Sequence, residues 1–150
     1  MRIFAKNKRA FFDYEIIEKY EAGIKLFGFE VKSIKNGNVS LKGSFVVAKN
    51  KEVFLLNTFI APYQQKNTPK DYDPQKTRKL LLKKKEIEGL IGKTSQKGLT
   101  LVPIKVYNKG VKIKIEIALA KSKKKFQKKE KIKDRDLKRE AERDASARFK

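Results

Sequence analysis

Apolar and polar side chains alternate along two long segments of the chain. Between residues 12 and 26 the apolar side chains fall mostly on even positions, and between residues 111 and 119 they fall on odd positions. Successive side chains of a strand point to opposite faces of a sheet, so both segments are predicted to be strands with one face in a core. A bend in the first strand is expected at Ala22 and Gly23.

Shorter segments continue the same antiparallel pattern. Residues 45–48 and 53–56 are predicted to form a hairpin, and residues 80–82 a short strand. Residues 99–107 are predicted to form a further strand, in which Pro103 marks either an edge or a bulge.

The remaining segments of residues 1–120 predict helices and a loop. Apolar residues at helical spacing indicate short helices at 28–37 and 83–91, the second ending at Gly92. Residues 62–79 contain three prolines and are expected to form a long loop. Five or six antiparallel strands with two or three short helices place the chain in the mainly β class. We expect an OB-like closed antiparallel β-barrel with flanking helices, since closure removes exposed strand edges.

The last thirty residues have a different composition. They contain fourteen Lys or Arg but only four large apolar side chains, so they cannot bury enough apolar surface to offset the entropy of ordering. The sequence therefore predicts an OB-like barrel over residues 1–120 and a basic tail over residues 121–150 that is disordered when free.

Charge indicates the class of partner. The net charge is +22, with 25 basic against 11 acidic residues in 1–120 and 14 against 6 in 121–150. Such a balance favours a polyanion, and because lysine supplies 32 of the 39 basic residues, it favours phosphate backbone over base edges.

Composition also argues against several function classes. The chain has no His and no Cys, and no catalytic set of residues is evident, so we expect no enzyme activity, no metal and no cofactor. No apolar run approaches the roughly 20 residues of a membrane-spanning helix. A cytoplasmic, monomeric protein without a membrane partner is expected.

Three features are candidate RNA contacts, and each has an ordinary structural alternative. Lys112 and Lys114 share one strand face and form either a phosphate track or a plain solvated face. Leu81 is the middle one of three leucines that basic residues flank, and it is either exposed for packing on an unstacked base or buried in a two-sided strand. Phe126 lies among the five lysines of residues 123–129 and either stacks on a nucleobase or anchors the start of the tail.

Six short motifs in order closely resemble the SsrA-binding protein (small protein B) family of bacterial trans-translation. They are Asn7-Lys8-Arg9-Ala10, Glu21-Ala22-Gly23-Ile24, Gly28-Phe29-Glu30-Val31-Lys32-Ser33, Arg78-Lys79-Leu80-Leu81-Leu82, Gly98-Leu99-Thr100-Leu101-Val102-Pro103 and Leu119-Ala120-Lys121-Ser122-Lys123-Lys124. The chain departs from the family pattern at Phe12, Ser122 and Gln127, and at Gly43-Ser44-Phe45.

The resemblance implies a function and a set of site residues. It implies an OB-like barrel without enzyme activity that binds the tRNA-like domain of transfer-messenger RNA and delivers that RNA to stalled ribosomes. The tail is implied to become helical in the empty messenger channel beside the decoding site and the small-subunit ribosomal RNA. Carried over by motif, the RNA-contacting positions are Asn7, Glu21, Leu81 and Lys114, with Lys112 added from the strand pattern. The ribosome-contacting positions are Lys123, Lys124, Phe126, Lys128 and Lys129.

Two rival functions remain open at this point. A general OB-fold module for single-stranded RNA, or a translation-factor-like module, would share the charge and the fold. A metal-dependent nuclease would need clustered carboxylates, in which residues 1–120 are poor.

Overall fold

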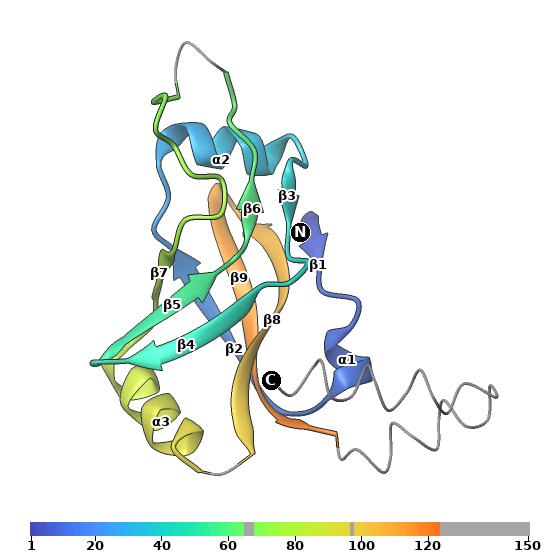
Figure 1. Ribbon diagram of the computed structural model, residues 1–150, viewed down its shortest axis with the longest axis vertical. Helices are drawn as coiled ribbons and strands as arrows, with labels where there is room; N and C mark the ends of the chain where they lie inside the picture. The colour runs from blue at the N-terminus through green and yellow to red at the C-terminus, as the bar shows by residue number, and fades with distance from the viewer. Residues whose placement is uncertain (65–67, 97, 124–150) are drawn as a thin grey trace, which may run out of the picture.

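A computed structural model of the protein describes residues 1–64, 68–96 and 98–123 (Figure 1). Within these ranges the fold is mainly β with three short helices, as the sequence predicts. The strands are β1 (Ile3–Lys6), β2 (Tyr14–Ile24), β3 (Val39–Ser40), β4 (Phe45–Lys49), β5 (Glu52–Leu56), β6 (Phe59–Ile60), β7 (Arg78–Leu81), β8 (Leu99–Lys109) and β9 (Lys112–Ser122). The helices are α1 (Ala10–Asp13), α2 (Gly28–Lys35) and α3 (Lys84–Thr94).

The main sheet closes on itself. Its strand order is β1-β8-β4-β5-β7-β2-β9, and β8 also pairs with β9, so β8, β4, β5, β7, β2 and β9 form a hydrogen-bonded ring. All these pairings are antiparallel. One edge of β8 runs along β9, while β4 pairs with the other edge at Leu101 and β1 pairs with it at residues 105–107. In Figure 1, α2 lies at one end of the molecule and α3 at the opposite end.

The alternation of the sequence places the core inside this ring. Inward-facing residues of several strands form one buried cluster, which includes Val53, Leu55, Leu80, Ile115 and Ile117. Burying an apolar side chain of this size is worth about 1.5–3 kcal/mol, and the closed ring keeps these inward-facing side chains out of water. The ring is therefore held by side chains contributed from distant parts of the chain.

Two register shifts lie within the ring, both in pairings of β9. The pairing of β8 with β9 shifts between Pro103 and Lys105, which confirms the predicted bulge; since β8 is paired on both sides, it is not an edge strand. The shift in β2 lies between Ile16 and Glu18, whereas the sequence indicated a bend at Ala22 and Gly23. Gly23 has a different role, described below.

The expected end of the helix at Gly92 is wrong. Helix α3 passes through Gly92 and ends at Thr94, where the Thr94 hydroxyl donates to the carbonyl of Leu90 (2.7 Å). A helical glycine costs only about 1 kcal/mol relative to alanine, and the fully buried Leu90 with the Lys93–Glu18 ion pair (2.9 Å) stabilises the last turn.

A buried ion pair attaches α2 and the long loop to the barrel. The guanidinium of Arg78 lies 2.7 Å from a carboxylate oxygen of Glu30, and both side chains are inaccessible to solvent. Arg78 also donates to the carbonyls of Thr58 (2.7 Å) and Pro74 (3.1 Å) and to the Tyr72 hydroxyl (3.0 Å). Burial, with Glu30 as the next cause, raises the pKa of Tyr72 to about 12. One side chain therefore joins α2, the loop and the start of β7.

Candidate nucleic-acid interface

A single row of paired residues crosses four strands on the outer face of the barrel. Tyr107 of β8 pairs with Lys114 of β9, Lys114 pairs with Gly23 of β2, and Gly23 pairs with Leu81 of β7. Directly paired residues of neighbouring strands project to the same face of a sheet. We call these four residues the outer row.

Leu81 is the apolar end of the outer row. Its side chain is 52% exposed, while that of the adjacent Leu80 is 1% exposed and lies in the core. The alternative of a strand buried on both faces is therefore wrong. A methyl group built on Gly23 would lie 3.3 Å from Cβ and 3.6 Å from Cδ1 of Leu81. The missing side chain at Gly23 gives Leu81 the room to lie against the sheet.

Leu81 contributes to a hollow that also contains two of the predicted lysines. The hollow is lined by Gly23, Ile24, Leu26, Val31, Leu81, Val111, Lys112, Ile113 and Lys114. Most of these side chains are apolar, and the ammonium groups belong to Lys112 and Lys114. An apolar surface beside two ammonium groups suits an unstacked base together with its backbone phosphates.

Glu21 lies on the same face, two residues before Gly23. Its carboxylate accepts hydrogen bonds from the Tyr107 hydroxyl and from Nζ of Lys109 (3.2 Å). These two bonds, that of Tyr107 first, lower the pKa of Glu21. Burial and the bond to Glu21 raise the pKa of Tyr107. The site therefore contains one firmly ionised carboxylate among lysines.

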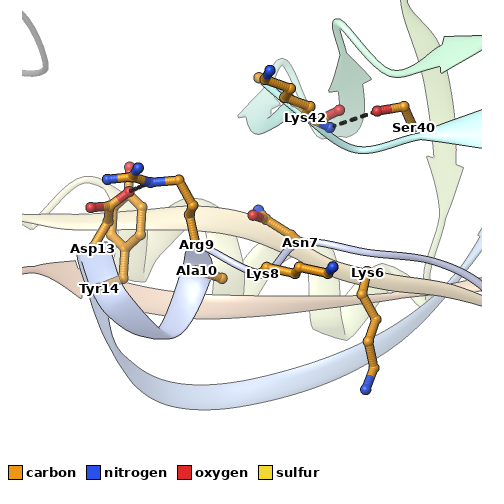
Figure 2. A pocket seen from close by; sticks show the side chains of 11 residues that line it. Lys6, Asn7, Lys8, Arg9, Ala10, Asp13, Tyr14, Ser40 and Lys42 are labelled. Carbon is orange, nitrogen blue, oxygen red and sulfur yellow. Dashed lines mark hydrogen bonds and ion pairs between the residues drawn. The ribbon is translucent and has the colours of Figure 1, made fainter.

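Asn7 is not part of this surface. Its side-chain amide donates to the carbonyl of Pro103 (2.9 Å) and its backbone N–H to that of Ile104 (2.7 Å), which ties the corner between β1 and α1 to the bulge of β8. Figure 2 shows Asn7 in a separate hollow, with residues of β1 and α1 on one side and Ser40 and Lys42 on the other. The basic residues that line it are Lys6, Lys8, Arg9 and Lys42.

The described part of the chain ends beside α1. The backbone N–H of Lys123 donates to the carbonyl of Asp13 (3.1 Å), and its Nζ donates to that of Phe11 (3.1 Å). The other predicted tail contacts, Lys124, Phe126, Lys128 and Lys129, lie outside the described residues.

Three members of the site could not be identified from sequence patterns. Tyr107 and Gly23 join the outer row only through strand register, and Lys109 bonds to Glu21 although the two residues are 88 positions apart in the sequence. The sequence pattern is misleading for Arg78. It flanks the leucines in the sequence like a surface residue, yet its side chain is buried.

No helix among the described residues is long and apolar enough to cross a membrane. In residues 1–64, 68–96 and 98–123, no three Asp or Glu side chains come close enough together to hold a metal ion.

Comparison with known proteins gives a consistent set of relatives. The model of the SmpB protein family matches residues 4–147. The SsrA-binding protein of Carboxydothermus hydrogenoformans is 53% identical over 109 residues, which are 73% of this chain and 72% of the relative. That of a Sulfurihydrogenibium species is 51% identical over 149 residues, 99% of this chain and 97% of the relative. A chain of a solved structure described as "tmRNA-SmpB: a journey to the center of the bacterial ribosome" is 49% identical, with a TM-score of 0.64, covering 79% of this chain and 83% of its own length.

Proposed function

The chain belongs to the SmpB protein family, and from this we propose that the outer row is the surface with which it holds transfer-messenger RNA. The protein binds that RNA and acts with the ribosome in trans-translation. Its RNA partner on this surface is the tRNA-like domain. Its role is that of a non-enzymatic binding factor working in the cytoplasm.

The observation that supports this placement is the outer row itself. Leu81 and Lys114 lie on either side of Gly23, and Lys112 lines the same hollow. A surface with an apolar end and a lysine end can hold a base and the adjoining phosphates at once. Charge then sets the strength of binding, since each phosphate neutralised by a lysine releases condensed counterions.

Residues 121–150 supply the ribosome contacts in this proposal. Lys123 leaves the barrel beside α1, away from the hollow that Leu81 lines. Lys124, Phe126, Lys128 and Lys129 follow directly and give the segment charge and one aromatic ring for small-subunit ribosomal RNA at the decoding site and in the messenger channel. Asn7, in its separate basic hollow, is proposed as a backbone contact rather than part of the outer row.

The test compares RNA binding of paired variants at several salt concentrations. The double variant Lys112→Ala/Lys114→Ala is expected to bind the tRNA-like domain more weakly, with a log–log salt slope smaller by about 2, because each phosphate contact contributes roughly 0.9 to that slope. Lys49→Ala/Lys51→Ala, at the exposed end of β4 and in the turn that follows it, is the control of equal charge. If both double variants weaken binding equally, the lysines act only through net charge and the placement is wrong.

Two further measurements separate this function from a general single-strand binder and separate the tail from the barrel. Full-length protein is expected to prefer the tRNA-like domain over oligo-U at matched salt. A chain ending at Lys123 is expected to bind the RNA nearly as tightly but to give no tagging of peptides on stalled ribosomes. Equal affinity for the two RNAs would indicate the general binder.

A further inference from the structure

We propose that Tyr107 is a positioning residue for RNA recognition: its hydroxyl holds the Glu21 carboxylate on the lysine-rich outer face, where Glu21 accepts a hydrogen bond from a donor group of the bound nucleotide. The donor is a ribose 2′-hydroxyl or a base amino group. This inference rests on the proposed function and adds a point of selectivity to a surface that otherwise attracts any phosphate backbone.

The side chain of Tyr107 lies in a position that brings its hydroxyl to Glu21. Tyr107 projects to the outer face, yet its side chain is only 5% exposed. Its hydroxyl bonds to Glu21 of β2, although β9 lies between β8 and β2. The side chain therefore extends along the sheet across β9, with Nζ of Lys105 lying 5.5 Å from the ring centroid. A tyrosine in this position delivers a buried hydroxyl to one carboxylate.

The surroundings of the Glu21 carboxylate are rich in lysine. The basic groups on this face include Lys105, Lys109, Lys112 and Lys114. A second carboxylate, Glu116, pairs with Glu21 across the strands and lies 3.9 Å from Nζ of Lys19. A carboxylate in such a field weakens the attraction for phosphate, so its presence needs another function. An ionised carboxylate is an acceptor only, and the donors that RNA offers are base amino groups and 2′-hydroxyls.

The Glu21 carboxylate has hydrogen-bond acceptor sites that the protein does not use. A carboxylate has about four acceptor sites, of which Tyr107 and Lys109 use two. The Glu21 side chain is 37% exposed, so the remaining sites are accessible from solvent. Two donors on the protein side fix the orientation of the carboxylate and leave its accessible sites for a third donor.

The chain contains a matched control for this arrangement. Tyr20 donates to Glu18, and Nζ of Lys93 lies 2.9 Å from the same carboxylate oxygen, so a second glutamate of β2 is held by a tyrosine and a lysine. That trio links β2 to α3 and neither Glu18 nor Tyr20 lines the hollow of Leu81. Tyr20→Phe removes the same kind of bond where we expect no RNA.

The experiment measures binding of the full-length protein to the tRNA-like domain carrying single 2′-deoxy substitutions or inosine in place of guanosine. Wild-type protein is expected to lose about tenfold or more in affinity at one RNA position, because hydrogen bonds to charged groups are the stronger class. Tyr107→Phe and Glu21→Gln are each expected to weaken binding of unmodified RNA about three- to tenfold and to be insensitive to the modification at that position. The double variant is expected to be no weaker than Glu21→Gln alone, and Tyr20→Phe is expected to bind as wild type does.

Several results would overturn the inference. They are a Tyr107→Phe protein that binds as tightly as wild type, additive effects of the two substitutions, or equal sensitivity of wild type and both variants at every RNA position. Glu21→Gln with the modified RNAs decides the matter alone if Tyr107→Phe does not fold. Normal binding by Lys112→Ala/Lys114→Ala would instead show that the outer row is not the interface, so the two failures are distinguishable.

Discussion

Replacing Leu81 with alanine tests the outer row most directly, because its neighbour Leu80 provides an internal comparison. Complete burial of a leucine side chain is worth about 1.5–3 kcal/mol. Leu81 is 52% exposed, so about half of that value, roughly 0.8–1.5 kcal/mol, remains available for contact with RNA. Leu81→Ala is therefore expected to weaken binding of the tRNA-like domain about four- to twelvefold.

The loss of folding stability is expected to be small for Leu81→Ala and large for Leu80→Ala. The half of Leu81 that already packs on the sheet accounts for about 1 kcal/mol of folding free energy, and no closed cavity forms on its removal. Leu80 is almost completely buried, so Leu80→Ala is expected to cost about 2–5 kcal/mol. At roughly 4 °C per kcal/mol, the melting temperature falls by about 4 °C for Leu81→Ala and about 8–20 °C for Leu80→Ala.

Circular dichroism melting and fluorescence anisotropy with labelled RNA measure both quantities on the same samples. Ile17→Ala is the matched control, since Ile17 is 48% exposed but lies outside the hollow; it is expected to change melting about as much as Leu81→Ala and to leave binding unchanged. A Leu81→Ala protein that melts as early as Leu80→Ala while keeping its RNA affinity would falsify the assignment of Leu81 to the interface.

Two other substitutions test features that support the site. Gly23→Ala brings a methyl group within 3.3 Å of Leu81 Cβ, so Leu81 must move. RNA affinity is expected to fall about threefold while the melting temperature changes little. Unaltered binding would show that the position of Leu81 over Gly23 is unimportant. Arg78→Met leaves the Glu30 carboxylate buried without its partner and is expected to destabilise the fold by about 3–5 kcal/mol in urea unfolding. Lys79→Met is the control, because Lys79 forms an exposed ion pair with Glu52 at 4.0 Å. Equal effects of the two substitutions would contradict this account of the buried pair.

Local periodicity predicted the longer strands of the main sheet, but not the short strands β1, β3 and β6. Alternation predicted that Leu80 and Leu81 point to opposite faces, and the structure decides that the face of Leu81 is exposed. Proline, which lacks a backbone N–H, predicted an edge or a bulge at residue 103, and the structure has a bulge. The end of α3 was mispredicted because the buried Leu90 and the contacts of the last turn outweigh the local preference of Gly92.

Long-range register was not predictable from the same patterns. The outer row joins residues 107, 114, 23 and 81, and nothing in the local sequence of β2 indicates which residue of β9 will lie opposite Gly23. The same limit concealed Tyr107 as a partner of Glu21 and Arg78 as a buried partner of Glu30. A family resemblance could supply Glu21 and Leu81, but only the paired strands show which residues orient them.

The position of β9 in the ring has a consequence for how the protein is made. Strand β2 is complete at residue 24, yet most of its pairing is with β9, which ends at residue 122. At a synthesis rate of roughly 5–20 residues per second, the nascent chain carries β2 without this partner for roughly 5–20 seconds. Strand β8, the other neighbour of β9, is likewise left with one edge unpaired until the last of these residues emerges. The face that carries Glu21, Gly23 and Lys114 is thus assembled at the end of translation. An incomplete chain that stops before β9 therefore has a lysine-rich composition, but it lacks this paired face and leaves the edges of β2 and β8 open.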